Sequence, residues 1–315
     1  VSWRIKSSGT TAHPTKASIA KHYEKLEMRN TFIRTLEKIA ASEDIFLLVG
    51  DLGYSVVENF SKNYPSKFLN VGVAEQNMAA IASGIASTSK RVFTYSIANF
   101  PTFRAAEQIR NLIDYHSYPV TTVSVGSGLS YGNLGYTHHG VTDLGLMKLF
   151  CNHYLYTPCD PDEVAFCVQD ITKNSRPSYL RLGKTNEPNL SKQFRYSTYG
   201  DWIVRYLTPQ RNSRLIIRIA NDSNILTRRV NDLHLYDQIS IPRWSGTFED
   251  EIFALLTEYE EIIVYENHQY NCGIYSTLKT VYPNMNNMRS LALNSDCLTS
   301  VGDEKYLNEK FLNFN

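Results

Sequence analysis

The chain has 315 residues, of which 43% are hydrophobic and 20% charged, and its formal net charge at pH 7 is +1. No apolar run approaches the ~18 residues that a membrane-spanning helix needs. The near-neutral charge excludes a global field that would draw the chain to nucleic acid or to an anionic membrane. Because the net charge is near zero, any anionic ligand must be held by local groups. The length predicts two domains in a soluble protein.

Five cysteines, an odd number without a C-x-x-C pair, argue against both a disulfide framework and a zinc site. We expect reduced thiols that pack as small apolar residues, and a cytoplasmic location. The cysteines are Cys151, Cys159, Cys167, Cys272 and Cys297.

The first part of the chain predicts one α/β domain over residues 28–190. Residues 1–27 are polar without a clear apolar period, and we interpret them as a poorly ordered N-terminal extension. From Met28 onward, short β-rich runs alternate with helical segments, which is typical of a parallel sheet with crossover helices. Near-continuous apolar strands predict a sheet covered on both faces. The expected strands are 45–50, 68–71, 91–96, 120–125, 153–157 and 178–182, and the expected helices are 29–41, 74–87, 102–116 and 162–173.

A second, smaller α/β domain is expected over residues 200–315. The sequence becomes polar and loop-like over residues 188–201, and we place the boundary there. No G-x-G-x-x-G follows the first strand of this domain, where the sequence reads ANDSN, so a dinucleotide-binding role is not supported. The expected strands are 214–220, 239–242, 261–266 and 289–293, and the expected helices are 224–233, 249–259 and 273–281.

The most informative segment is NVGVAEQNMAAIASGIA, residues 70–86, in which a strand ends at Gly72 and a helix begins near Ala74. Spacings of four, three and four predict an apolar face toward the sheet, formed by Ala74, Met78, Ile81 and Ile85. The row of the helix that contains Glu75 continues through three small side chains, Ala79, Ala82 and Ala86. Such a row predicts a tight contact with another helix, for example across subunits. On spacing alone, Glu75 is a first-turn carboxylate that complements the helix dipole.

Five motifs occur in order between residues 28 and 183: GVAEQNMAAIASGIA, RVFTYSIANFPTFRAAEQIRN, YGNLGYTHHGVTDLGLM, TPCDPDEV and PSYLRLG. Together they resemble the pyrimidine-binding domain of the transketolase family, with weaker similarity in VYENHQYNCGIYSTL and VGDEKYL. The resemblance implies a doubly wound parallel sheet of the thiamine-diphosphate-binding, pyrimidine type, followed by a smaller transketolase C-terminal domain. It also implies transfer of a two-carbon ketol unit between sugars or sugar phosphates.

The resemblance implies that Glu75 hydrogen-bonds N1′ of the aminopyrimidine ring of thiamine diphosphate and activates the cofactor. A carboxylic acid that donates to N1′ favours the imino tautomer, whose nitrogen removes the proton from C2 of the thiazolium ring. This role requires the carboxyl to be largely protonated near neutral pH, which burial among apolar groups can produce. Glu75 is therefore the principal catalytic candidate.

Other positions in the motifs imply contacts with the cofactor. Phe100 would stack on the pyrimidine ring with Ile97 and Phe103 beside it, although a core position is the alternative for the two phenylalanines. Asp51, at the end of the first strand, matches a family aspartate near the cofactor and could instead cap a helix. His138 would relay protons or bind substrate hydroxyls, with a structural role as the alternative.

Several basic residues are candidates for holding a sugar phosphate. Arg29 and Lys184 align approximately with family residues that bind this group, and Arg104 and Arg110 are further candidates. Each could equally be a solvated surface cation.

The chain lacks the family's diphosphate site, which uses G-D-G and a downstream Asn with Mg²⁺. The resemblance therefore implies a separate N-terminal, diphosphate-binding transketolase subunit, which would hold the diphosphate and the Mg²⁺ (or Ca²⁺) in an α2β2 assembly with the cofactor at the subunit contact. For this chain itself we predict no metal ligand.

One departure leaves the substrate open. Where full-length transketolases carry a second histidine and an aspartate ahead of the T-H motif, this chain has Gly126 and Leu134. The alternative function is that of a deoxyxylulose-phosphate-synthase-like enzyme or a 2-oxoacid dehydrogenase E1 β-type component acting on a 2-keto acid. A third hypothesis is a non-catalytic paralogue that serves as a scaffold.

Overall fold

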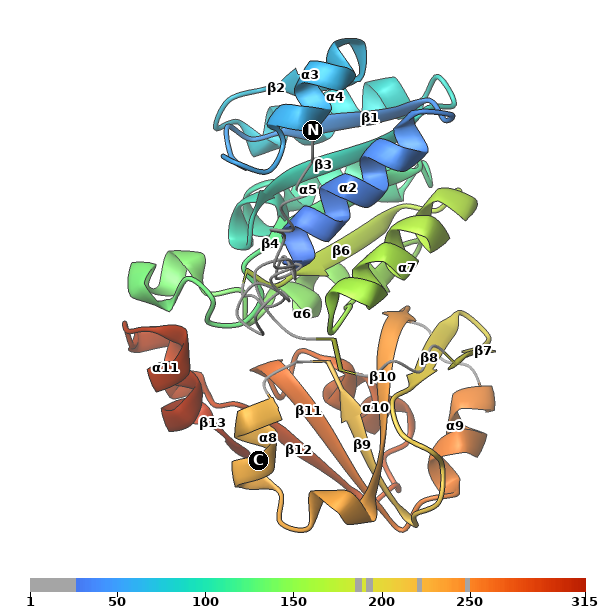
Figure 1. The fold of residues 1–315 in the computed structure, drawn as a ribbon, viewed down its shortest axis with the longest axis vertical. Helices are drawn as coiled ribbons and strands as arrows, with labels where there is room; N and C mark the ends of the chain where they lie inside the picture. Colours follow the sequence, from blue (N-terminus) through green and yellow to red (C-terminus); the bar gives the residue numbers. More distant parts are fainter. Residues whose placement is uncertain (1–26, 185–188, 191–194, 220–222, 247–249) are drawn as a thin grey trace, which may run out of the picture.

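The structure, a computed structural model, describes residues 27–315 except 185–188, 191–194, 220–222 and 247–249. The expected N-terminal extension lies outside the described residues except for Glu27. Within the described residues, thirteen strands form one continuous sheet in the order β13-β12-β11-β9-β10-β5-β6-β4-β3-β1-β2, with a β7–β8 hairpin attached to β10 (Figure 1). The α/β prediction is therefore confirmed.

The strands are β1 (Ile45–Val49), β2 (Phe68–Asn70), β3 (Arg91–Ile97), β4 (Val120–Val125), β5 (Tyr154–Tyr156), β6 (Ser178–Leu182), β7 (Arg195–Tyr199), β8 (Trp202–Tyr206), β9 (Arg214–Arg218), β10 (Tyr236–Trp244), β11 (Glu261–Gln269), β12 (Met288–Leu293) and β13 (Leu312–Phe314). The α-helices are α2 (Met28–Ala40), α3 (Glu58–Asn63), α4 (Glu75–Ala86), α5 (Ala106–Gln108), α6 (Asp143–Met147), α7 (Pro161–Lys173), α8 (Ser223–Arg229), α9 (Asp250–Thr257), α10 (Ile274–Val281) and α11 (Glu304–Phe311).

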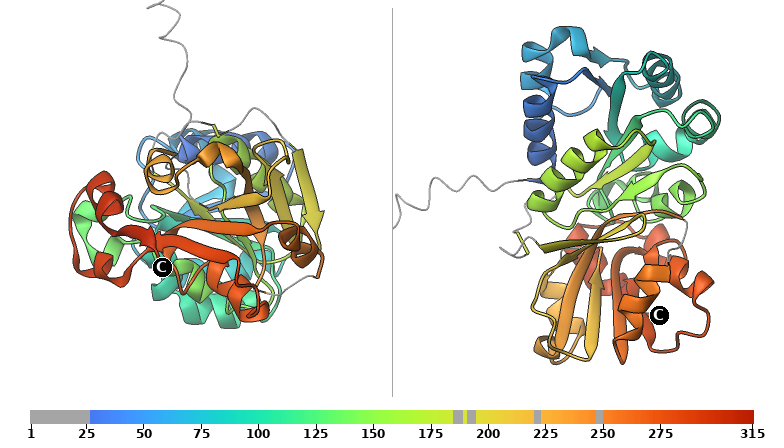
Figure 2. Two further views of the ribbon diagram at one scale, coloured as in Figure 1. Left: turned by 90° about the horizontal axis from the view of Figure 1, so that it is seen from below. Right: turned by 90° about the vertical axis from the view of Figure 1, so that its right-hand side faces the viewer.

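The first six strands form the parallel half of the sheet, in the order β2-β1-β3-β4-β6-β5. Helices α2 and α7 cover one face, and α4 and the helical segment 100–114 cover the other (Figure 2). Side chains alternate between the two layers along a strand, so Leu47 joins the core under α2 with Phe32 and Phe93, while Leu48 joins the core under α4 with Met78. Burial on both faces explains why these strands are almost wholly apolar.

The second half of the sheet joins the first through β5 and β10, which run antiparallel with Arg243 opposite Tyr156. Strands β10, β9, β11 and β12 are parallel to one another, whereas β8 and β13 pair antiparallel with their neighbours. Backbone pairing therefore crosses the expected domain boundary without a break. The division into domains of residues 28–190 and 200–315 stays a prediction.

Two expectations about secondary structure were wrong. Residues 195–199, expected to be a loop, form strand β7 at the end of the hairpin, and the polar sequence reflects partial exposure of this edge strand. The helix expected over 102–116 begins at Phe100 and contains two π-helical stretches, Phe100–Arg104 and Ile109–Asp114, on either side of the short α5. Pro101 fits the first turn, where no backbone N–H is required.

The apolar face of α4 packs on the core as predicted, with Ile81 and Ile85 half-buried against the cluster that contains Met78, but the buried surface extends further around the helix. The fully buried side chains are Glu75, Met78, Ala79, Ala82, Ser83 and Ala86. The small side chains admit the segment 100–114 of the same chain, and the Ser83 hydroxyl donates a 2.8 Å hydrogen bond to the carbonyl of Leu112. The tight helix contact predicted from the alanines is therefore made within the chain.

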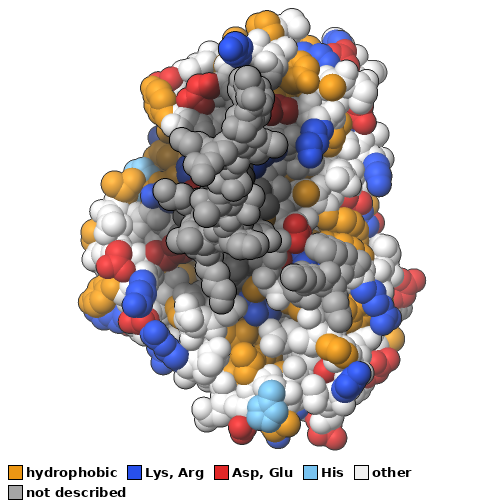
Figure 3. All heavy atoms as spheres, in the orientation of Figure 1, with side chains coloured by type: hydrophobic (Ala, Val, Ile, Leu, Met, Phe, Trp, Pro, Cys, Tyr) orange, Lys and Arg blue, Asp and Glu red, His pale blue; other side chains and the backbone are white. Residues whose placement is uncertain are grey.

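The surface has no dominant charge on the face seen in Figure 3, where lysine and arginine side chains are interspersed with acidic ones. Across the described residues, no helix combines the length and the hydropathy that a membrane span requires. All five cysteines are described and no disulfide joins them; three are buried, whereas Cys151 is exposed and Cys272 half-buried.

Candidate active site

Glu75 is the first residue of α4, and its carboxyl lies where β1 and β3 end. The side chain is fully buried, and its oxygen Oε1 accepts a 3.0 Å hydrogen bond from the Ser96 hydroxyl on β3. A Cβ built on Gly50, directly after β1, would lie 3.5 Å from the same oxygen. Carboxyl ends of parallel strands are the usual ligand-binding edge of an open α/β sheet. The predicted catalytic acid therefore lies at the ligand-binding edge of the sheet, where its side chain is buried rather than exposed to solvent.

The second carboxyl oxygen of Glu75 is paired with a cation. Nη1 of Arg104 lies 2.6 Å from Oε2, and the arginine side chain is 42% exposed. The same guanidinium lies over the ring of Phe100, with its central carbon 4.6 Å from the ring centroid. An ion pair with arginine stabilises an ionised carboxylate. Arg104 and Ser96 therefore engage the two oxygens of the Glu75 carboxyl in this arrangement.

Phe100 begins a row of ring contacts that joins residues far apart in sequence. Its ring meets the His138 imidazole edge to face at 5.1 Å, and His138 meets Tyr131 at 6.4 Å between centroids. Nζ of Lys184 lies 4.4 Å from the centre of the Tyr131 ring. The structure thus brings three predicted site residues, Phe100, His138 and Lys184, into one row of contacts through Tyr131.

His138 is held by its loop and by its partial burial. The Asn99 amide donates to the carbonyl oxygens of Thr137 at 3.3 Å and His139 at 3.0 Å, on either side of His138. Its Nδ1 lies 2.9 Å from the Thr137 hydroxyl. Burial lowers the pKa of His138 below its ordinary value of 6.5, so the imidazole is neutral at pH 7 and can both donate and accept a hydrogen bond.

Arg29, at the start of α2, approaches the same region. It pairs with the Glu27 carboxyl at 2.9 Å, and its charge opposes the burial that raises the pKa of Tyr131. Arg29 and Lys184, predicted to hold a phosphate, therefore both lie near Tyr131. Arg110 is exposed and donates to the neighbouring Asn111, at 3.0 Å, and no described contact links it to the site.

Asp51 also follows β1, but its carboxyl is engaged by Asn70. The Asn70 amide donates to Oδ1 at 3.0 Å, while its carbonyl accepts from the backbone of Asp51 at 3.1 Å and of Gly72 at 3.0 Å. Asp51 has φ 56°, a left-handed conformation that aspartate tolerates better than most residues. The exposed carboxyl caps no helix here, because α3 begins only after Val57 and has no side-chain cap. Its observed role is to join the ends of β1 and β2.

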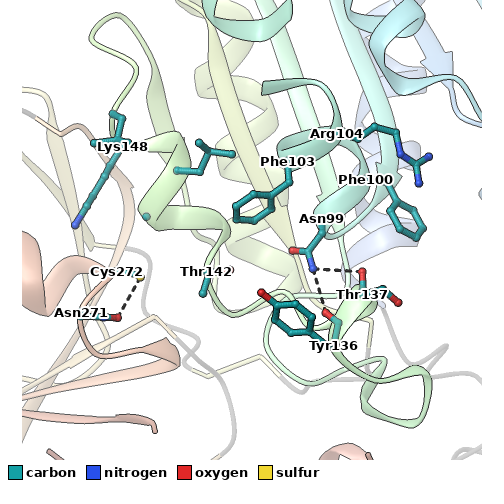
Figure 4. Close-up of a pocket in the computed structure, with 13 residues that line it drawn as sticks. Asn99, Phe100, Phe103, Arg104, Tyr136, Thr137, Thr142, Lys148, Asn271 and Cys272 are labelled. Carbon is teal, nitrogen blue, oxygen red and sulfur yellow. Dashed lines mark hydrogen bonds between the residues drawn. The ribbon is translucent and has the colours of Figure 1, made fainter. Parts of the chain in front are cut away.

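A cavity of about 780 Å³ opens beside Phe100 and Arg104 (Figure 4). Its near wall includes Asn99 and Tyr136 together with Phe103, which is exposed and points toward the cavity. The far wall is formed by 142–149 and by the 271–272 turn of the second half: Thr142, Gly145, Leu146, Lys148, Leu149, Asn271 and Cys272. Glu75 and His138 do not line this cavity, so it adjoins the site and does not enclose it. Ile97 is half-buried at the end of β3 and does not line it either.

The glycine at position 126 has a structural explanation. Gly126 has φ 97°, and a Cβ on it would lie 2.3 Å from the Tyr131 ring. Tyr131 therefore fills the space into which a larger side chain at 126 would project. Leu134, the second departure, is exposed.

Sequence reasoning missed three residues that build this site. Ser96 is a polar residue near the end of an apolar strand, a signal that could have marked it. Asn99 and Tyr131 gave no signal of their own, because their partners are backbone carbonyls or residues distant in sequence. The pairing of Arg104 with Glu75 spans 29 positions and was likewise not foreseen.

Comparison with known sequences shows which family the chain resembles. Residues 24–189 match the family described as "Transketolase, pyrimidine binding domain". The chain is 31% identical over 164 residues to one of the subunits of the apulose-4-phosphate transketolase of Phocaeicola vulgatus, a match that covers 51% of this chain and 53% of that protein. It is 27% identical over 237 residues to a 1-deoxy-D-xylulose-5-phosphate synthase of Alkaliphilus oremlandii, covering 73% of this chain and 37% of that protein. The first match thus spans about half the length of that relative.

Comparison with solved structures agrees with the sequence comparison. A structure described as a split gene transketolase, inactive beta4 tetramer, superposes with a TM-score of 0.75 at 22% identity, over 91% of this chain and 93% of that one. The resemblance seen in the motifs is thereby confirmed. The chain belongs to the transketolase pyrimidine-binding domain family.

Proposed function

We propose that this chain is one subunit of a thiamine-diphosphate-dependent transketolase that transfers a two-carbon ketol unit between sugars or sugar phosphates. The observation that carries the proposal is the buried carboxyl of Glu75 at the ends of β1 and β3, linked to Phe100 through the guanidinium of Arg104, which contacts both. The relative from Phocaeicola vulgatus carries a transketolase name, which supports the same activity.

The described residues fit the pyrimidine ring of the cofactor. A buried carboxyl and a half-buried aromatic ring, both contacted by the Arg104 guanidinium, offer one hydrogen-bonding group and one flat face, which are the two contacts that an aminopyrimidine needs. Thiamine diphosphate supplies the stabilisation of the carbanion when it is bound. We assign to Glu75 the holding of a proton at N1′, to Phe100 the stacking contact, and to Ile97 and Phe103 the neighbouring apolar surface.

The polar residues around Tyr131 suit a sugar phosphate. Neutral His138 can orient a substrate hydroxyl or move a proton to it. Arg29 and Lys184 bring two positive charges to this region, and cations of this kind bind phosphate through charge-assisted hydrogen bonds. Asp51 is the weakest member of the predicted set, because Asn70 already engages its carboxyl.

The active enzyme in this proposal contains a second polypeptide. The sequence has no G-D-G motif, and in the described part of the chain no group of three His, Cys, Asp or Glu side chains is placed to hold a metal. We propose an α2β2 assembly in the cytoplasm, in which Mg²⁺ or Ca²⁺ is held by an N-terminal, diphosphate-binding subunit. The neighbour described as an inactive beta4 tetramer supports the idea that a chain of this type needs its partner.

The test is to purify the chain alone and together with its diphosphate-binding partner, and to measure ketol transfer. We expect no measurable turnover from the chain alone and robust turnover from the pair. In the pair, Glu75→Ala should lower the rate by ~10²–10⁴, the range for a lost proton-transfer group, without loss of assembly. Robust activity of the chain alone would refute the need for a partner, and a near-normal rate of the variant would eliminate Glu75 as the activator.

A second candidate function is supported by the packing at Gly126. Tyr131 fills the space that a side chain at position 126 would enter, so this chain has no donor-binding side chain there, which favours a 2-keto acid as donor, as in the similar 1-deoxy-D-xylulose-5-phosphate synthase. An assay with pyruvate as donor in place of a ketose phosphate distinguishes the two. Transfer from a ketose phosphate alone would eliminate this alternative.

A further inference from the structure

Arg104 makes the two contacts that the proposed function gives to the pyrimidine ring. Its guanidinium donates to Oε2 of Glu75 at 2.6 Å and lies over the face of Phe100 at 4.6 Å. Figure 4 shows the guanidinium next to the Phe100 ring, at the rim of the cavity. A guanidinium is flat and stacks on aromatic rings, so it resembles an aminopyrimidine in shape, although it donates to the carboxyl whereas N1′ accepts from it.

Both oxygens of the Glu75 carboxyl are engaged in this arrangement. The Ser96 hydroxyl holds Oε1 from inside the sheet, where Ser96 is fully buried and fixed on β3. Arg104 holds Oε2 from the outer side, and its side chain is 42% exposed. A ring that approaches Glu75 along the face of Phe100 therefore meets Arg104, and of the two partners only Arg104 has solvent and an adjoining cavity to move into.

We propose that Arg104 is a placeholder for the cofactor: its guanidinium occupies the pyrimidine position in the free chain, balances the buried charge of Glu75, and moves away when the ring binds. The inference rests on the proposed function, because it takes the roles of Glu75 and Phe100 from there. The free site is kept from holding an uncompensated buried carboxylate, which would be costly. Departure of the guanidinium also frees Oε2 of Glu75 for a hydrogen bond with the ring.

The placeholder has a measurable consequence for affinity. Cofactor binds only to molecules in which Arg104 has moved, so the observed dissociation constant is the intrinsic one divided by the fraction of such molecules. Removal of the guanidinium raises that fraction. Arg104→Met keeps an unbranched side chain but loses both contacts, and we expect it to bind cofactor roughly tenfold more tightly, since the cation–π contact and the ion pair together hold the closed arrangement.

The experiment titrates the complete enzyme, this chain with its diphosphate-binding partner, with thiamine diphosphate and Mg²⁺ in a calorimeter. The matched control is Lys90→Met, because Lys90 also pairs with a carboxylate, Asp44, and lies over a ring, Phe46 at 5.4 Å, but at the opposite ends of the strands. Arg104→Met should tighten binding and Lys90→Met should leave it unchanged. Equal or weaker binding by Arg104→Met would overturn the placeholder and identify Arg104 as a residue that supports the bound ring.

Two further measurements separate this inference from the proposed function. If Glu75→Gln and Phe100→Ala leave cofactor affinity unchanged, the proposed function itself fails. If both weaken binding while Arg104→Met does not tighten it, only the placeholder fails. In the unaltered enzyme, the Arg104 Nε–H resonance should also change to that of a solvated arginine on saturation with cofactor; a resonance that stays unchanged overturns the proposal even if the variant does not fold.

Discussion

Asp143, the first residue of α6, is the centre of a buried ionic network that joins the two halves of the sheet. Its Oδ2 accepts from Nε of Arg181 on β6 at 2.9 Å and from the Tyr179 hydroxyl at 2.6 Å. Its Oδ1 lies 3.3 Å from Nε2 of His268 on β11, in the second half. Arg181 also donates to the side chain of Asn267 at 2.8 Å. Asp143 and Arg181 are both buried.

The substitution Asp143→Asn removes the negative charge and keeps the shape, so the buried guanidinium of Arg181 loses its counter-charge. Breaking a buried pair in this way costs about 3–5 kcal/mol of unfolding free energy, and we expect the lower end because the amide oxygen can still accept one hydrogen bond. The matched control is Glu309→Gln, which breaks the exposed pair with Arg228. Exposed pairs contribute at most ~1 kcal/mol.

The same carboxyl predicts a pH dependence. Burial alone would raise the pKa of Asp143, but the charge of Arg181, the nearby His268 and the hydrogen bond from Tyr179 outweigh it and hold the pKa well below 3.8. A folded-state pKa below the unfolded value stabilises the fold above the unfolded value and loses that contribution as pH falls. The stability gap between wild type and Asp143→Asn should therefore be full above pH ~4 and shrink below it.

Equilibrium urea denaturation of the whole chain measures both effects. We expect Asp143→Asn to lose several times more stability than Glu309→Gln at pH 7, with the difference shrinking toward pH 3. If the two variants lose equal stability, or if the gap is the same at pH 3 and pH 7, the network does not hold the halves together as described.

Two further predictions concern buried and crowded positions. Burial raises the pKa of Glu266 to about 7, although its carboxyl accepts from the backbone N–H groups of Ile274 and Tyr275. The folded chain then binds this proton more tightly than the unfolded chain does. As the pH rises from ~4.5 to ~7, the unfolding free energy of wild type should therefore fall relative to that of Glu266→Gln, by up to about 3 kcal/mol. Urea titrations that show a constant difference between the two proteins would contradict this. Gly126→Ala should destabilise by about 2 kcal/mol, because φ 97° is strained for alanine and its Cβ would overlap Tyr131. Part of that loss should disappear in the background of Tyr131→Ala, and thermal denaturation that shows no such recovery would mean that Tyr131 is not the obstacle.

The parallel half of the sheet could be predicted from the sequence because each strand there is buried on both faces. Continuous apolar runs identified β1, β3, β4 and β6 to within two residues. Strand β7 could not be found in this way, since it lies at an exposed edge and has the composition of a loop. The antiparallel pairing of β5 with β10 depends on contacts between distant segments, which no local pattern records.

The site residues could be predicted only where a residue type suited to the chemistry also stands in a family motif. Glu75 and Phe100 were found through the order of the family motifs, and in the structure both contact the guanidinium of Arg104. The role of Arg104 could not be read from the sequence, because no local pattern marked the π-helical turn Phe100–Arg104 that joins it to Phe100. Spacing along the chain also could not show that Tyr131 fills the space beside Gly126.

The central claim is that the carboxyl of Glu75 contacts the pyrimidine nitrogen of thiamine diphosphate. The most direct measurement compares the affinity of the complete enzyme for thiamine diphosphate and for an analogue in which N1′ is replaced by carbon, in wild type and in Glu75→Ala. Wild type should bind the analogue more weakly by about 1–3 kcal/mol, the cost of a buried polar group left without its partner, and Glu75→Ala should bind both alike. Equal discrimination by the two proteins would contradict the contact and with it the proposed function.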